Sequence, residues 1–160
     1  MKRLIGLIVV GGLLLAGCAQ PSVTTSSPPE LYDKVWISPG EVDVGNFFPG
    51  ARAEPDPQDW LTIHNGNDYQ AKFSITYRQP DKITEGYVRA PDEAKNWVII
   101  DDPAPVLKAK ETRQVLVAVE MPQGANAPPK WEFWIVVKDE TQPGMVQTEL
   151  ACKWLVTMKQ

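Results

Sequence analysis

The stretch from Trp131 to Val137 constrains the fold more than any other part of the chain. It consists almost entirely of aromatic and β-branched residues and lies between Pro128-Pro129 and Asp139-Glu140. A short apolar run between such breakers predicts a central β-strand, because it is too short for a typical helix. Alternate residues of a strand face opposite sides. One predicted face therefore holds Trp131, Phe133, Ile135 and Val137, and the other holds Glu132, Trp134 and Val136. The first face suits a packed core, whereas the second is unusually apolar for a solvated surface.

Short apolar runs separated by turn residues continue along the rest of the chain. The 15 prolines and 11 glycines predict many turns, which favours β structure. Asp59–His64 and Ala71–Arg78 flank the turn sequence Asn65-Gly66-Asn67-Asp68, which predicts a hairpin. Asn46–Pro57 is predicted to be a loop, and Pro91–Ala94 suits one helical turn. Further strands are predicted at Val35–Ser38, Glu41–Val44 (an edge strand), Tyr87–Arg89, Trp97–Ile100, Arg113–Val119 and Thr148–Met158.

This spacing predicts an all-β fold, namely a two-sheet antiparallel β-sandwich with Greek-key connections. Its length of 160 residues allows one domain, here expected over 32–160. Two features resemble the immunoglobulin-like modules of bacterial surface proteins: Trp60 to Asp68, and Glu111-Thr112 leading through Val115-Leu116-Val117 to Met121-Pro122. The resemblance covers about Val35 to Lys159 and implies an immunoglobulin-like fold, but no ligand. Because the Cys…Trp…Cys arrangement of antibody domains is missing, a fibronectin-like sandwich is the better comparison.

The N-terminus predicts export. Lys2-Arg3 precedes an apolar run from Leu4 to Leu15, which at ~1.5 Å per residue is too short to cross a hydrocarbon core of ~30 Å. This pattern is typical of a signal peptide, here residues 1–17. Leu15-Ala16-Gly17-Cys18 resembles the lipobox of bacterial lipoproteins, which implies cleavage before Cys18, diacylation of its sulfur and acylation of the new N-terminus. The alternative is an ordinary secretory signal with a chance cysteine.

Residues 18–31 are predicted to form the lipidated cysteine and a flexible linker. Gln20 to Glu30 is rich in Pro, Ser and Thr and almost free of apolar side chains, so it cannot bury enough surface to fold. Extended at ~3 Å per residue, it would reach about 30 Å and hold the domain clear of the lipid headgroups. O-glycosylation is a weaker alternative to a plain spacer. The resemblance implies a lipid-anchored protein of the cell membrane or outer membrane, and Ala19 carries no inner-membrane retention signal of the Asp type.

The sequence lacks the residues that several kinds of binding or catalytic site require. The formal net charge is −4, and no basic cluster or glycine-rich phosphate loop is present, which argues against nucleic acids and nucleotides as partners. Once Cys18 carries lipid, Cys152 has no intramolecular partner and is expected to be a buried, inert thiol. His64 is the only histidine, on the polar face of its predicted strand, so it is expected to be a surface residue rather than a zinc ligand or part of a catalytic triad.

Acidic pairs are the remaining candidates for a metal site. They occur at Asp56 and Asp59, Asp92 and Glu93, Asp101 and Asp102, and Asp139 and Glu140. Calcium prefers several oxygen ligands, but none of these pairs has the spacing of a recognised calcium loop. Solvated turns are therefore the expectation, and we predict no cofactor and no metal.

Six tryptophans are the strongest functional signal. Trp131 and Trp154 are in phase with core residues, whereas Trp60 and Trp134 are out of phase with the inward residues of their strands. Exposed tryptophans serve as platforms for sugars and anchors for proteins. The alternative is that a loop such as Asn46–Pro57 covers them. The candidate binding patch comprises Trp134, Val136, Leu155 and Trp60.

Two functions follow from this pattern. The preferred one is a non-catalytic, lipid-anchored module that binds a protein partner, or has a structural role, in the cell envelope. The alternative is a carbohydrate-binding module that uses Trp134 or Trp60 as its platform. No set of candidate catalytic residues supports an enzymatic function.

Overall fold

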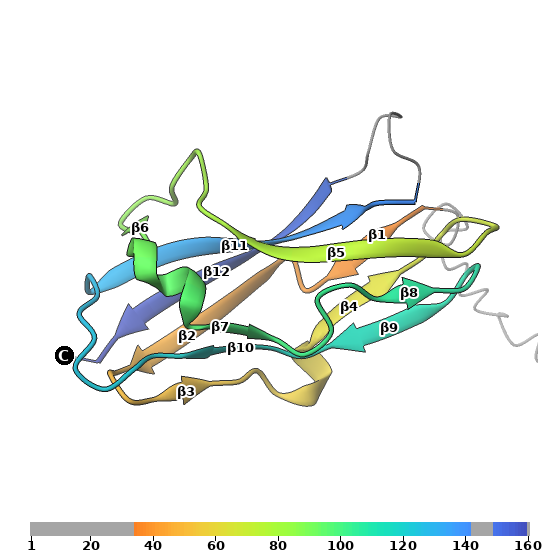
Figure 1. Ribbon diagram of the computed structural model, residues 1–160. Helices are drawn as coiled ribbons and strands as arrows, with labels where there is room; N and C mark the ends of the chain where they lie inside the picture. The colour runs from red at the N-terminus through yellow and green to blue at the C-terminus, as the bar shows by residue number, and fades with distance from the viewer. Residues whose placement is uncertain (1–33, 142–148, 160) are drawn as a thin grey trace, which may run out of the picture.

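The computed structural model describes residues 34–141 and 149–159, which form a two-layer β-sandwich (Figure 1). The predicted all-β, immunoglobulin-like class is therefore confirmed. The predicted signal peptide, Cys18 and the linker lie outside the described residues. Within the described ranges the helical segments are two 3-10 helices, η1 (Pro57–Asp59) and η2 (Asp92–Asn96), neither of which could cross a bilayer.

One layer is a six-stranded sheet centred on the strand that the sequence singles out. Its strand order is β2 (Glu41–Phe47), β12 (Glu149–Met158), β11 (Lys130–Asp139), β5 (Ala71–Arg78) and β8 (Val106–Leu107), with β6 (Val88–Arg89) beside the start of β11. Most neighbours are antiparallel, as predicted. However, β2 runs parallel to β12 and β6 runs parallel to β11, which the prediction of a purely antiparallel sandwich missed.

The other layer consists of two three-stranded sheets that follow one another (Figure 1). The first has the order β1 (Trp36–Ser38), β4 (Leu61–His64) and β9 (Thr112–Val115), and the second has β3 (Arg52–Ala53), β10 (Val117–Glu120) and β7 (Val98–Ile100). The single strand predicted over Arg113–Val119 is interrupted at Leu116, whose N–H donates to the Asp101 carboxylate (2.9 Å). This interruption divides the layer into its two sheets.

The core lies between the layers on the predicted face of β11. Trp131, Phe133, Ile135 and Val137 are all buried, which confirms the prediction for this face. Phe133 stacks on Tyr77 of β5 (centroids 5.4 Å apart) and on Trp154 of β12 (5.5 Å). Trp97, at the end of η2, meets Trp131 edge to face at 6.1 Å. Offset and edge-to-face ring pairs of this kind stabilise a core beyond the area that they bury.

The predicted hairpin of Asp59–His64 with Ala71–Arg78 is wrong. β4 pairs with β1 and β9 in one layer, whereas β5 pairs with β11 and β8 in the other. Both strands do alternate as predicted, but their apolar sides face each other across the core. The turn sequence therefore carries the chain from one layer to the other.

Asn65 fixes this crossing. Its side-chain amide is buried and donates to the carbonyl oxygens of Tyr69 (2.8 Å), Lys108 (2.8 Å) and Leu107 (3.3 Å). Its side-chain oxygen accepts from the N–H of Asn67 (3.1 Å). A crossing loop cannot satisfy its buried backbone groups through a ladder, so a polar side chain does so instead.

The N-terminal strands make a second change of layer. β1 pairs with β4, and directly after Pro39-Gly40 the chain enters β2, which pairs with β12 in the other layer. The Ser38-Pro39 peptide bond at this change is cis. β2 is the last strand of its sheet, so the predicted edge strand is confirmed, and it extends to Phe47 rather than ending at Val44. Asn46–Pro57 is not a pure loop, because it contains the end of β2 and the short strand β3.

Candidate functional site

A buried carboxylate, that of Glu132, lies on the outer face of β11. Glu132 is only 1% exposed, and its Oε1 accepts from Trp134 Nε1 at 2.8 Å. Its Oε2 accepts from the backbone N–H of Thr84 at 2.7 Å, in the connection between β5 and β6. The backbone of Glu132 also accepts from Ala90 N–H. Burying a carboxylate without hydrogen-bond donors would cost free energy, and here two neutral N–H donors offset that cost. The bond to Thr84 also fixes the β5–β6 connection over the start of β11.

The four residues of the candidate patch do not form one surface. Trp134, Val136 and Leu155 lie on the same outer face, because Leu155 of β12 stands opposite Glu132 in the β11–β12 register. Val136 and Leu155 are nevertheless buried (2% and 7% exposed), and Trp134 is partly buried with its N–H bonded to Glu132. Trp60 lies in the other layer, directly after η1. Whether the Trp134 face binds a partner stays a prediction.

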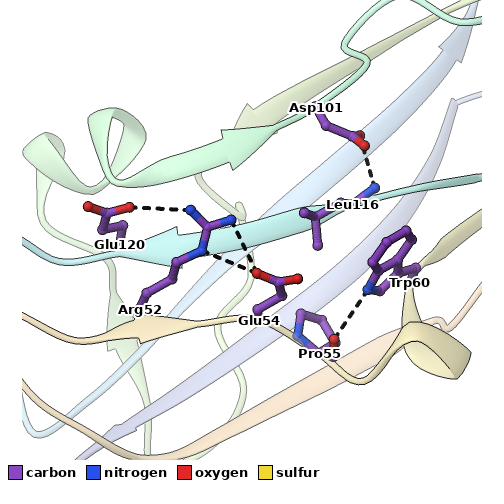
Figure 2. A network of polar contacts seen from close by, with 7 residues as sticks. All are labelled: Arg52, Glu54, Pro55, Trp60, Asp101, Leu116 and Glu120. Atoms are coloured by element: carbon purple, nitrogen blue, oxygen red, sulfur yellow. Dashed lines mark hydrogen bonds and ion pairs between the residues drawn. The ribbon is translucent and has the colours of Figure 1, made fainter.

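Trp60 is partly covered by the segment that the sequence predicted as a cover. Its Nε1 donates to the carbonyl oxygen of Pro55 at 3.3 Å. Figure 2 shows this bond beside an exposed cluster in which Arg52 of β3 contacts Glu54 (3.2 Å) and Glu120 of β10 (3.5 Å). Within residues 34–141 and 149–159, the exposed large apolar residues are Phe48, Tyr69, Val88 and Val106, and none of the six tryptophans is among them.

The expectation that His64 lies on the surface is wrong, because the side chain is only 3% exposed. Its ring stacks on Trp36 of β1 with centroids 5.3 Å apart, and its Nδ1 lies 2.8 Å from the Thr112 hydroxyl. Both partners lie directly opposite His64 on the neighbouring strands β1 and β9. Strand alternation placed His64 on an exposed outer face, but these cross-strand side chains contact its ring there.

Cys152 is buried, as predicted. It lies on the inner face of β12 opposite Ile135, and burial raises the pKa of its thiol to about 12. A thiol that stays protonated under physiological conditions is a poor nucleophile. The position therefore contributes to packing.

The acidic pairs do not assemble into a metal site in the described part of the chain. No group of three His, Cys, Asp or Glu side chains with metal-binding geometry occurs there. Several of the carboxylates bond to the protein itself: Asp102 pairs with Arg113 (3.5 Å), Glu140 pairs with Lys138 (3.3 Å), and Asp139 accepts from Thr141 N–H (2.9 Å). These contacts give the carboxylates roles in ordering turns.

A groove between β2 and β3 was missed by the sequence reasoning. These strands follow one another in the chain, yet β2 belongs to one layer and β3 to the other, so a hollow of about 650 Å³ remains between them. Partly buried apolar side chains of Val42, Val44, Ala51 and Ala53 line it. Exposed carboxylates of Glu41, Asp43, Glu54, Asp56 and Asp59 surround it. The alternation of Glu41-Val42-Asp43-Val44 was the signal for an edge strand, but the position of its neighbour could not be read from the sequence.

Comparisons with known proteins identify the architecture. No protein-family model matches the chain, and no curated protein matches it in sequence. Among solved structures, it is similar to PapD-like domain 7 of human CEP192 (TM-score 0.56, 15% identity, 96% of this chain and 97% of that chain). It is also similar to the periplasmic chaperone SfaE (TM-score 0.53, 13% identity, 79% of this chain).

A third similar structure is the CsuC–CsuE chaperone–tip adhesion subunit pre-assembly complex of Acinetobacter baumannii (TM-score 0.50, 13% identity, 79% of this chain). This chain spans only 59% of the SfaE chain and 52% of the matched chain in the CsuC–CsuE complex. At these identities the likeness establishes the fold alone. The described residues therefore form an immunoglobulin-type β-sandwich whose fold is similar to that of PapD-like domains.

Proposed function

We propose that this protein is a lipid-anchored module of the cell envelope whose β-sandwich binds a protein partner without catalysing a reaction. The observation that carries the proposal is the open groove between β2 and β3, which combines apolar side chains with a strand edge that pairs with no other described strand. Proteins recognise extended segments of other proteins at such edges, because the backbone supplies affinity and side-chain pockets supply specificity.

The fold neighbours support a protein as the partner. CsuC and CsuE are described as a complex of a chaperone with a tip adhesion subunit, and SfaE as a periplasmic chaperone. Their fold resembles that of this chain, although the sequences are only 13% identical. The neighbours support a binding module, but they do not identify its partner.

The proposed location depends on the sequence of the N-terminus. Cys18 would carry the lipid, and 18–31 would link it to the sandwich. Two or three acyl chains hold a protein at a bilayer durably, whereas one chain does so only marginally. The domain would then lie outside the cytoplasm at the cell membrane or outer membrane.

A glycan-binding function has weaker support. A sugar platform requires an exposed aromatic face, and the six tryptophans are buried or partly buried. The indole N–H groups of Trp60 and Trp134 also already donate to protein acceptors.

Chemical crosslinking in intact cells, followed by purification of the tagged full-length protein, tests the function. We expect recovery of one or a few envelope proteins that are absent when a tagged, unrelated lipoprotein is purified in the same way. Recovery of no specific envelope protein would contradict the proposal. Binding of the purified protein to a glycan array, lost in Trp134→Ala or Trp60→Ala, would favour the carbohydrate-binding alternative.

A further inference from the structure

β2 is the last strand of its sheet, so one of its edges is open to the groove. Among the described residues β2 pairs only with β12, and β3 pairs only with β10. Lys153 N–H donates to Gly40 O at 2.9 Å, so Gly40 directs its backbone toward β12. Successive residues of a strand direct their backbone groups to opposite sides. Glu41, Asp43 and Gly45 therefore present N–H and C=O groups to the groove without a described partner.

The groove also lacks the apolar contacts that a paired strand would supply. Val42 and Val44 point inward and pack against the core, yet they remain partly exposed, as do Ala51 and Ala53 across the groove. Phe48, where β2 leads toward β3, is 50% exposed and also lines the hollow. An added strand would place alternate side chains onto these residues, because strand side chains alternate with a period of two.

The charge of the groove selects the occupant. Glu41 pairs with Lys153 (2.6 Å) and Glu54 pairs with Arg52 (3.2 Å). Asp43, Asp56 and Asp59 form no ion pair with another described residue. Among the described residues that line the groove, Arg52 is the only one with a basic side chain. The rim is therefore acidic, and a basic partner complements it. A second copy of this chain is disfavoured, since pairing two β2 edges would bring like charges together.

We infer that the groove between β2 and β3 binds an extended, basic segment of the partner protein, which adds to the open edge of β2 as a further strand. Alternate apolar side chains of the segment contact Val42, Val44 and Ala53, and its basic side chains face Asp43 and the acids of the rim. This inference rests on the proposed protein-binding function and specifies which surface performs it.

A model peptide tests the inference on the full-length protein in detergent. The probe is a short synthetic peptide in which valine and lysine alternate, and hydrogen–deuterium exchange reports which backbone amides it protects. We expect slower exchange in β2, with an effect that weakens as salt is raised. A peptide in which valine and glutamate alternate should protect nothing.

Two substitutions at one position separate backbone pairing from charge. Asp43→Ala removes a carboxylate but keeps the outward N–H, and should weaken binding by roughly two- to fivefold, as expected for an exposed ion pair. Asp43→Pro removes the N–H as well, and should abolish protection of β2. Circular dichroism checks that both variants fold. If Asp43→Pro does not fold, Asp43→Ala and the glutamate peptide still decide the result.

Four outcomes would overturn the inference. Equal protection by the glutamate peptide would remove the charge argument, and protection confined to β6 or β8 would place the binding edge elsewhere. Concentration-dependent protection of β2 without any peptide would identify a second copy as the occupant. If crosslinking recovers an envelope protein while β2 is never protected, the binding function stands and the groove assignment fails.

Discussion

The carboxylate of Glu132 accepts a hydrogen bond from the indole of Trp134, two residues along the same strand, over 2.8 Å. Both side chains lie on the outer face of β11, and the second carboxylate oxygen of Glu132 bonds to Thr84 N–H at 2.7 Å. The unusual composition of this face is therefore explained by a polar network that fastens the β5–β6 connection to the sheet. Trp134 belongs to that network, which fixes the orientation of its partly buried indole.

Glu132→Ala should lower the free energy of unfolding by about 1–3 kcal/mol, because two donors near the buried carboxylate lose their acceptor. Glu132→Gln should cost less, since its one remaining amide oxygen can still accept. Urea unfolding gives the stabilities, and hydrogen exchange at 79–87 shows whether the connection loosens. Equal stability of the wild type and Glu132→Ala would contradict this role.

Asn65→Ala should destabilise the fold by about 2–4 kcal/mol, because three carbonyl oxygens and one N–H lose a partner at the crossing between layers. Asn67→Ala is the matched control: its backbone N–H still bonds to Asn65, so it should cost less than about 1 kcal/mol. Chemical denaturation measures both. A control variant as unstable as Asn65→Ala would show that the amide network is not what fixes the crossing.

Cys152 makes stability fall at alkaline pH. Its thiol has a pKa of about 12 in the folded protein because it is buried, against 9.0 for the ordinary group. Above about pH 9 the unfolded chain releases this proton while the folded chain keeps it, so the unfolded state is favoured as the pH rises. Burial likewise raises the pKa of Tyr77 to about 12, with a further contribution from Asp92, and this acts in the same direction.

Urea unfolding between pH 8 and pH 11 should therefore show a declining free energy of unfolding. In Cys152→Ala the decline should be shallower by up to about 1.4 kcal/mol per pH unit, whatever stability the smaller side chain costs at neutral pH. The native thiol should also resist iodoacetamide at pH 8 and react once urea unfolds the protein. Rapid labelling of the native protein would contradict the buried assignment.

The sequence predicted side-chain environments better than strand partners. Alternation correctly placed Trp131, Phe133, Cys152 and Trp154 in the core, because burial of one strand face leaves a direct trace in the residue pattern. The Asn65–Asp68 turn correctly predicted a reversal of the chain. However, turn residues do not determine whether a chain re-enters the same sheet or crosses to the facing one, so the hairpin prediction failed.

The same limit explains the errors at the candidate site. His64 was expected on a solvated face, and the sequence did not determine what covers the face of Glu132. The indole of a neighbouring strand contacts the buried His64, and a distant connection bonds to the buried Glu132. The groove arises because β2 and β3 pair with strands far along the chain, β12 and β10. Such long-range pairings determine which strand edges stay open, and the local sequence pattern does not predict these pairings.

Cys18→Ser tests the predicted anchor. Serine cannot form the thioether to lipid, so the variant should lose metabolic labelling with palmitate and leave the membrane fraction. Wild-type protein processed in parallel is the reference. Continued fractionation of Cys18→Ser with membranes would show that the lipoprotein assignment is wrong.

The most direct test of the binding function is site-specific photocrosslinking in intact cells of the native organism. A photoreactive amino acid replaces Ala53 in the groove in one variant of the full-length protein, and Val106 at the opposite end of the six-stranded sheet in another. We predict a discrete crosslinked envelope protein from position 53 and none from position 106. Crosslinks from neither position, or the same diffuse products from both, would contradict the specific binding of a partner protein at this groove.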